Sequence, residues 1–188
     1  SLSRSIEVSR RDKPTLAKVA SVVREVAPEI VLTHSPVDYM EDHMNTCRLA
    51  VTAAFARGMP NFATDPPRPA VSSNVTLYHA QPYSHRGPLG GVVEPELVID
   101  TTDLIDLKKK MLSKHASQKK WLDESQGVNS YLDTMAELDG EVGRMSCLFK
   151  YAEGWRKHLH MGFCGPKDDP LRVALKERVL VAAKYTSG

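Results

Sequence analysis

The stretch that decides the fold is VLTHSPVDYMEDHMNTCRLAVTAAF, residues 31–55. It starts inside a continuously apolar run, EIVLTH (29–34), crosses a short polar segment, and continues as a helical pattern of small residues. Because the apolar run lacks polar alternation, it predicts a strand covered on both faces, as in a parallel sheet between helices. The polar segment then lies at the carboxyl end of that strand, where ligands bind in open α/β sheets.

Helical and strand patterns alternate along the rest of the chain. Helices are predicted over 12–28, 42–57, 103–122, 128–152 and 170–184, and further strands over 74–80 and 95–102. Gly140 and Gly143 predict a break or kink in the fourth helix. The alternation favours an α/β, Rossmann-like layered fold with a mostly parallel sheet flanked by helices. The predicted core comprises Leu16, Val19, Val23, Val26, Ile30, Leu32, Leu77, Val98 and Ile99.

Composition limits the class of protein. A chain of 188 residues with 41% hydrophobic content can bury a core, and its length suggests one domain or at most two. Its 25 basic and 23 acidic residues are interspersed, which argues against nucleic acid as a partner. No apolar run approaches the roughly 20 residues that a membrane span needs. The three cysteines are widely spaced and predict reduced thiols. We therefore expect a soluble, cytoplasmic protein without membrane contact, and a homo-oligomer is compatible with this composition.

The polar segment of the opening stretch contains the candidate chemistry. A histidine in the first turn of a helix, such as His43, is held rigidly, and the adjacent Asp42 could orient a partner or support a charge. A neutral imidazole with a fixed second group is what a catalytic zinc ion requires, although one histidine cannot hold zinc tightly. The alternative is that His43 and Asp42 are ordinary residues of a helix start.

Three segments carry a resemblance to a known family. EIVLTHSPVDYMEDHMNT (29–46) resembles the second signature of the PIG-L/LmbE-like superfamily of zinc-dependent de-N-acetylases. ELVIDTTDLIDLKKKMLSKHASQKKWL (96–122) is similar to a later strand, turn and lysine-rich helix of that family, and YAEGWRKH (151–158) to an aromatic and acidic segment near its C-terminus. The resemblance covers about residues 13–160. It implies one LmbE-like α/β domain over 1–165, followed by a tail over 166–188 with a predicted helix.

The resemblance implies an activity and a set of site residues. The expected protein is a zinc-dependent hydrolase that removes an acetyl group from a small N-acetylated substrate, an amino sugar in this family. His43 takes the place of a zinc ligand and Asp42 that of the carboxylate before it. We also expect catalytic roles for Tyr39 and His34, which lie in the same segment.

Two departures from the family pattern leave alternatives open. The leading Ala-His-Pro-Asp-Asp motif, which supplies two zinc ligands and the catalytic base, has no counterpart here, so the first strand or strands of the fold are expected to be missing. Met40 stands where the family has a histidine that stabilises the oxyanion, and methionine cannot donate that hydrogen bond. Candidates to replace it are the Tyr39 hydroxyl and the imidazoles of His34, His79, His85 and His115. The alternatives are a zinc-dependent hydratase on the same scaffold and a non-catalytic binding or assembly protein.

Overall fold

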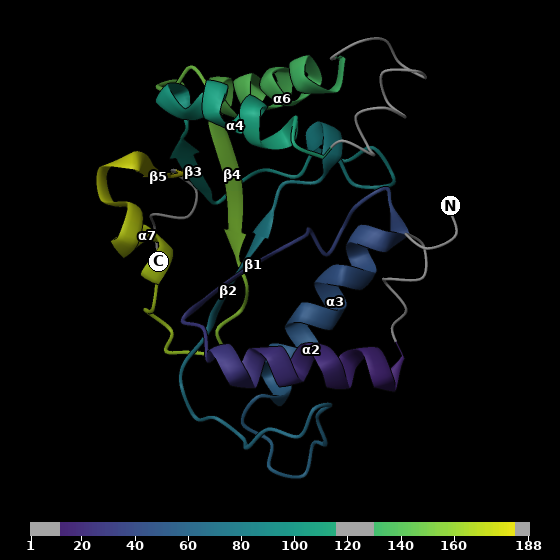
Figure 1. Cartoon of the computed structure of the whole chain (residues 1–188). Coiled ribbons are helices and arrows are strands. Elements are labelled where there is room, and N and C mark those ends of the chain that lie inside the picture. Colours follow the sequence, from purple (N-terminus) through teal and green to yellow (C-terminus); the bar gives the residue numbers. More distant parts are fainter. Residues whose placement is uncertain (1–11, 116–129, 183–188) are drawn as a thin grey trace. The chain divides into compact units, whose positions relative to one another are not determined.

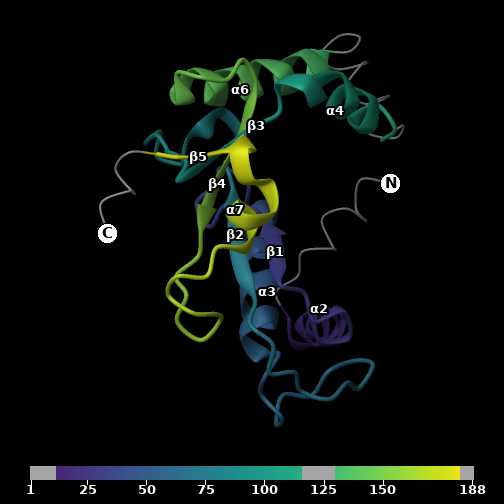
Figure 2. The ribbon, with the colours of Figure 1, turned by 90° about the vertical axis from the view of Figure 1, so that its left-hand side faces the viewer.

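The computed structural model describes residues 12–115 and 130–182. These residues form two compact units, which are treated separately below. The first unit contains residues 12–94 and 156–174, and the second contains residues 95–115, 130–155 and 175–182. Figures 1 and 2 show the ribbon in two views. In the described part of the chain, no helix is both long and apolar enough to cross a membrane.

Five strands form a mixed sheet in the order β1-β2-β4-β3-β5. β1 (Ile30–Thr33) pairs parallel to β2 (Thr76–Ala80), whereas β3 (Leu97–Asp100) pairs antiparallel to both β4 (Ala152–Lys157) and β5 (Val179–Val181). The α/β class is confirmed, but the prediction of a mostly parallel sheet is wrong. A continuous apolar run predicts a strand that is buried on both faces, but it does not predict the direction of the neighbouring strands. β3 is buried in this way although both of its neighbours are antiparallel.

In the first unit, helices α2 (Lys13–Val26) and α3 (Glu41–Ala56) pack against each other and cross in Figure 1. Asp12 caps α2 as its sequence predicts, because its carboxylate accepts a hydrogen bond from the Thr15 amide at 2.8 Å. The small residues Ala53, Ala54 and Ala56 of α3 are buried. The core of this unit consists of Ala54, Val75, Leu77 and Phe163, with Val31, Val51 and Cys164 packed against it.

Two buried arginines hold the loops of the first unit. Arg24, on α2, donates hydrogen bonds to the carbonyl oxygens of residues 56, 57, 59 and 68. Arg57, which follows α3, donates to those of residues 54, 73, 162 and 163. Each guanidinium therefore ties together four carbonyl groups from separate positions of the chain, and each arginine is exposed by less than a tenth.

The face that α2 buries differs from the predicted valine stripe. Its buried residues are Ala20, Ser21 and Arg24, and Val26 is 64% exposed. Leu32 on β1 is also exposed, at 53%, so both residues are corrections to the predicted core. Leu77, Val98 and Ile99 are buried as predicted. The other four predicted core residues, Leu16, Val19, Val23 and Ile30, are half-buried.

In the second unit, helix α4 (Ile105–Leu112) packs on α6 (Ser130–Ser146), which also contacts β3. The core here consists of Val98, Val142 and Ala152, with Phe149 and Leu180 packed against it. The predicted helix over 103–122 begins with a 3₁₀ turn, η3 (Thr102–Leu104), and its part beyond His115 lies outside the described residues. α6 runs through Gly140 and Gly143 without the predicted break.

The last two predicted helices end earlier than predicted, and each is followed by a strand. The helix predicted over 128–152 ends at Ser146, and the chain turns back as β4. Gly143 permits this reversal, because a Cβ there would lie 2.6 Å from the carbonyl oxygen of Lys150. The helix predicted over 170–184 is a short α7 (Pro170–Leu175) and a 3₁₀ turn, η4 (Lys176–Arg178), followed by β5.

Candidate functional site

The loop that follows β1 is fixed by buried polar side chains. Ser35 is 1% exposed, and its hydroxyl donates to the carbonyl oxygen of Val37 at 2.7 Å and accepts from the Val37 amide at 3.2 Å. The same hydroxyl oxygen accepts a hydrogen bond from Nη2 of Arg156 at 2.7 Å. The loop therefore has one conformation, held both by its own turn and by a guanidinium from the end of β4.

Asp38 holds His43 in a defined orientation. Its carboxylate is 2% exposed; Oδ1 accepts from the Met40 amide at 3.0 Å, and Oδ2 lies 3.1 Å from Nδ1 of His43. A carboxylate can only accept, so Nδ1 of His43 carries a proton, and in the neutral imidazole Nε2 keeps its lone pair. The sequence led us to expect Asp42 as the orienting carboxylate. Asp38 performs this role, five residues before His43.

The other predicted site residues gather around His43. The ring of His34, the residue after β1, stacks on that of His43 with centroids 4.5 Å apart and an interplanar angle of 3°. Tyr39 meets His43 edge-on at 6.2 Å. Partial desolvation lowers the pKa of His34, and the nearby His43 acts in the same direction, whereas Asp38 and Asp42 oppose them. The neutral form of His34 is therefore favoured near pH 7.

Asp42 contributes an orphaned oxygen. Its Oδ1 is buried and has no hydrogen-bond partner among the described residues, although the residue as a whole is half-buried. A buried carboxylate oxygen without a partner is costly, which marks a position where a hydrogen-bond donor or a cation would be favourable.

The predicted candidate His79 lies beside this loop and pairs with His158, a partner that the sequence did not predict. His79, on β2, is 4% exposed; its Nδ1 lies 3.0 Å from the carbonyl oxygen of His34, and its Nε2 lies 2.9 Å from Nδ1 of His158. Burial lowers the pKa of both histidines. Because the carbonyl can only accept, neutral His79 donates from Nδ1 and accepts at Nε2. His158 then donates from Nδ1 and keeps a lone pair on Nε2.

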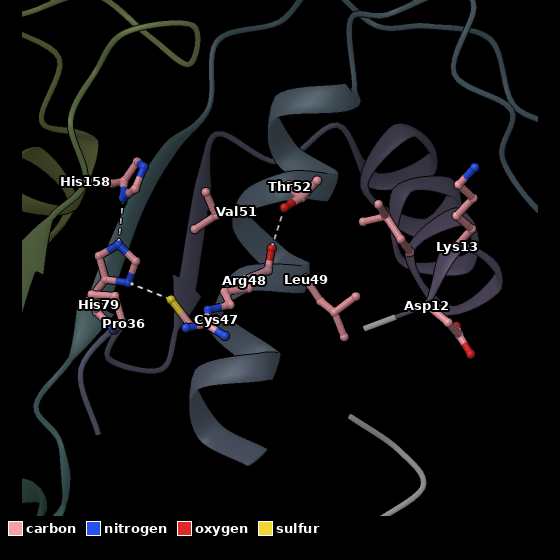
Figure 3. Close-up of a pocket in the computed structure, with 11 residues that line it drawn as sticks. Asp12, Lys13, Pro36, Cys47, Arg48, Leu49, Val51, Thr52, His79 and His158 are labelled. Atoms are coloured by element: carbon pink, nitrogen blue, oxygen red, sulfur yellow. Dashed lines mark hydrogen bonds between the residues drawn. The ribbon is translucent and has the colours of Figure 1, made fainter. Parts of the chain in front are cut away.

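This pair borders a cavity of about 580 Å³ (Figure 3). Cys47 of α3 contacts the histidine pair, with its Sγ 3.5 Å from Nδ1 of His79, and burial raises the pKa of this thiol. The residues lining the cavity do not include His43. They are Asp12, Lys13, Leu16, Pro36, Cys47, Arg48, Leu49, Val51, Thr52, His79 and His158.

The remaining histidine candidates are placed differently. His85 is 6% exposed and lies in η2 (Tyr83–His85), within the loop that follows β2. His115 is exposed just after α4, in the second unit. No sequence signal singled out His158 and Arg156, because their segment was predicted only as a family resemblance and not as a strand. Cys47, one of the cysteines predicted to be reduced, is a free thiol and is buried.

Fold and site together define a layered α/β domain with a carboxylate-held histidine at the carboxyl end of a parallel strand pair. No family model matches the sequence. The structure does match solved structures of the LmbE-like fold of the PIG-L superfamily over most of the chain, which confirms the resemblance drawn from the sequence motifs.

Three of these structures show the extent of the match. The N,N'-diacetylchitobiose deacetylase of Pyrococcus horikoshii is 20% identical, with a TM-score of 0.61 over 85% of this chain and 57% of that one. The 4-carboxy-2-hydroxymuconate hydratase GalB of Pseudomonas putida is 25% identical, with a TM-score of 0.57 over 79% and 59%. The conserved protein TT1542 of Thermus thermophilus is 18% identical, with a TM-score of 0.56 over 84% and 62%. The chain thus spans about three-fifths of the length of each.

The zinc ion implied by the resemblance can be tested against the residues present. A catalytic zinc site needs three protein ligands and an open position. Within residues 12–115 and 130–182, no group of three or more His, Cys, Asp or Glu side chains is arranged to hold a metal ion. The free Nε2 of His43 and the orphaned oxygen of Asp42 are donors of a suitable kind. They do not make a complete set, so zinc does not fit the described residues alone.

Proposed function

We propose that this chain carries one part of the active site of an LmbE-type hydrolase, which removes the acetyl group from a small N-acetylated amino sugar. The observation that carries the proposal is the buried Asp38 holding His43 at the carboxyl end of β1, on a fold shared with a deacetylase. In open α/β sheets this edge is where substrates bind. The match in fold alone does not fix the substrate, which is inferred from the motif resemblance.

The chain's own residues have defined tasks in this proposal. His43 presents a lone pair on Nε2, because Asp38 keeps the proton on Nδ1. An imidazole in this form can accept a proton or bind a metal ion, and the buried carboxylate stabilises the positive charge that either event creates. His34 keeps the ring of His43 in place by stacking on it. Tyr39, 56% exposed at the edge of His43, is the proposed hydrogen-bond donor in place of the family histidine at Met40.

Zinc is part of the proposal as the expected cofactor, with the remaining ligands contributed from outside the described residues. When bound, zinc would supply a more acidic water and polarise the amide carbonyl. Asp42, whose buried Oδ1 has no hydrogen-bond partner among the described residues, is proposed to face the zinc ion together with His43.

A hydratase is the second candidate function. The hydratase GalB is the relative with the highest identity of the three, at 25%, and its structure matches 79% of this chain. Met40 also removes the donor that amide hydrolysis uses in typical deacetylases of this family. Addition of water to an activated double bond needs the same proton acceptor, but no acetyl group leaves.

Release of acetate from N,N'-diacetylchitobiose distinguishes these functions. The chain is assayed with zinc, both alone and together with any residues that its reading frame encodes upstream. Acetate release that is abolished by His43→Ala, and retained in the matched variant His115→Ala, supports the deacetylase. Hydration of an unsaturated dicarboxylate without acetate release would support the hydratase instead. Equal activity of His43→Ala and His115→Ala would contradict the proposed site.

A further inference from the structure

Two exposed tyrosines stand next to His43. Tyr39, from the loop after β1, is 56% exposed, and Tyr83, from the loop after β2, is 52% exposed. Their ring centroids lie 5.8 Å apart and the ring planes are tilted by 55°. Tyr39 in turn meets His43 edge-on at 6.2 Å. Tyr39 and Tyr83, which we name the tyrosine rim, therefore extend from His43 outward to solvent.

The loop that carries Tyr83 is held in a defined conformation. Ser84 and His85 both adopt left-handed backbone conformations, with φ of 60° and 56°, which residues other than glycine rarely adopt. His85 is 6% exposed, and its carbonyl oxygen accepts from the Val93 amide at 2.8 Å. Strained conformations of this kind persist only where the surroundings enforce them, and they cluster at functional sites. The buried His85 thus anchors the turn that projects Tyr83.

The two loops also touch each other away from the tyrosines. Gly87 approaches Val37 so closely that a Cβ on Gly87 would lie 2.9 Å from Cγ1 of Val37. The loop of Gly87 is closed by a hydrogen bond from its amide to the carbonyl oxygen of Gly91 at 2.9 Å. Because the loop after β1 is itself fixed by Ser35 and Asp38, the spacing between Tyr39 and Tyr83 is set by packing on both sides.

Exposed aromatic rings that are held in place are unusual without a ligand. Leaving two large rings half in water forgoes the favourable free energy of burying them, and their fixed geometry lowers the entropy lost on binding. An aromatic face with a hydroxyl at its edge suits a ligand that has an apolar face and a polar periphery. A pyranose ring has this character, since its axial C–H groups form apolar patches and its hydroxyl groups lie around the edge.

We propose that the tyrosine rim is the specificity determinant of this site and recognises the ring of a pyranoside, holding its N-acetyl group towards His43. This inference rests on the proposed deacetylase function for the identity of the reacting group. It assigns the recognition of the sugar ring to Tyr39 and Tyr83 by contact with their faces. The ring faces do not contact the amide, which is left to the Tyr39 hydroxyl and His43, so an acyclic N-acetyl compound gains nothing from these faces.

Binding of two small probes tests the rim without relying on activity. Methyl N-acetyl-β-glucosaminide carries the ring and N-acetylethanolamine carries the same amide without it; both are titrated into the chain by NMR. Replacing Tyr83 with leucine is expected to raise the dissociation constant of the ring probe about 3- to 10-fold, and Tyr39→Leu likewise. Tyr39→Phe and Tyr83→Phe keep the ring faces and should stay within about 2-fold of the parent chain.

Controls separate recognition from damage to the loop. Leu89→Ala changes a residue of the same loop that is 99% exposed, and it should leave binding of both probes unchanged. The acyclic probe should bind the parent chain and the Tyr83 variants equally. The rim is refuted if the ring probe does not bind the parent chain, if Tyr83→Leu binds it unchanged, or if both probes weaken together.

Acetate release distinguishes failure of the rim from failure of the proposed function. If the ring probe depends on Tyr83 but no variant or parent chain releases acetate, the rim stands and the deacetylase proposal fails. If the parent chain releases acetate from diacetylchitobiose and Tyr83→Leu leaves KM unchanged, the deacetylase stands and the rim fails. Tyr83→Leu is expected to raise KM and to leave kcat within about 2-fold.

Discussion

Removal of the Asp38 carboxylate should destabilise the loop after β1 and release His43. The carboxylate is 2% exposed and makes two contacts, with the Met40 amide at 3.0 Å and with Nδ1 of His43 at 3.1 Å. A hydrogen bond to a charged group contributes about 1.5–3 kcal/mol when its partner stays buried. Because the His43 side chain is 30% exposed, water can replace part of that contact. We therefore expect Asp38→Ala to lower the free energy of unfolding by about 2–4 kcal/mol.

Asp38→Asn separates the structural role of this side chain from its electrostatic role. The asparagine oxygen can still accept from the Met40 amide, so the loss of stability should be about half as large. Its NH₂ group then faces Nδ1 of His43, which must become the acceptor, and the proton moves to Nε2. The variant thus keeps the loop and inverts the tautomer. A loss of about 10- to 100-fold in metal affinity or activity is expected.

Urea unfolding measures the first effect and ¹⁵N NMR of the imidazole measures the second. Asp133→Ala is the matched control, because that carboxylate is 71% exposed and only pairs with Lys109 at 3.3 Å, so its removal should change stability by less than about 0.5 kcal/mol. If Asp38→Ala is no more destabilising than Asp133→Ala, or if Asp38→Asn leaves the proton on Nδ1, the carboxylate does not hold His43 as described.

Three further predictions concern other parts of the first unit. Burial lowers the pKa of His79 and His158 below 6.5, so as the pH falls from about 6.5 the unfolded chain binds protons that the folded chain does not. The free energy of unfolding should then fall by up to about 2.7 kcal/mol per pH unit. This pH dependence should weaken in His79→Gln, and an unchanged slope in that variant would contradict the prediction. Arg57→Met removes four hydrogen bonds from the guanidinium to carbonyl oxygens and should cost about 3–5 kcal/mol in urea unfolding, compared with less than about 0.5 kcal/mol for the exposed Arg86→Met. Equal losses would refute the role of Arg57. Met40 has the N-cap backbone of α3 without a capping side chain, so Met40→Ser should raise stability by about 0.5–1 kcal/mol in thermal unfolding, and a loss would mean that its side chain packs.

The part of the fold that local patterns control was predictable from the sequence. α2 begins at its Asp12 cap, β1 and β2 lie in the predicted apolar runs, and α3 follows its small-residue pattern. β4 was not predicted as a strand: the helix predicted over 128–152 reaches only its first residue, and residues 151–158 were interpreted only through the family resemblance. Its strand conformation comes from pairing with β3, a partner more than fifty residues away, which no local pattern reports. β5 was missed for the same reason.

The candidate site was predictable in position but not in its contacts. The histidines and carboxylates between His34 and His43 were identified from their place after an apolar strand. The choice of Asp38 over Asp42 as the partner of His43 depends on the turn that Ser35 enforces, and a spacing of five residues matches no helical or strand period. The contact of His79 with His158 joins β2 to the residue that follows β4, and these two strands neighbour each other only in the folded sheet.

Zinc titration by calorimetry tests most directly the central claim that His43 forms one wall of a site completed by other ligands. The chain alone and a version extended upstream in its reading frame are each measured with and without His43→Ala. The account predicts weak or no binding by the chain alone, because the described residues contain no set of three ligands, and tight binding by the extended chain that is lost on His43→Ala. Tight binding by the chain alone, or tight binding by the extended chain that survives His43→Ala, would contradict it.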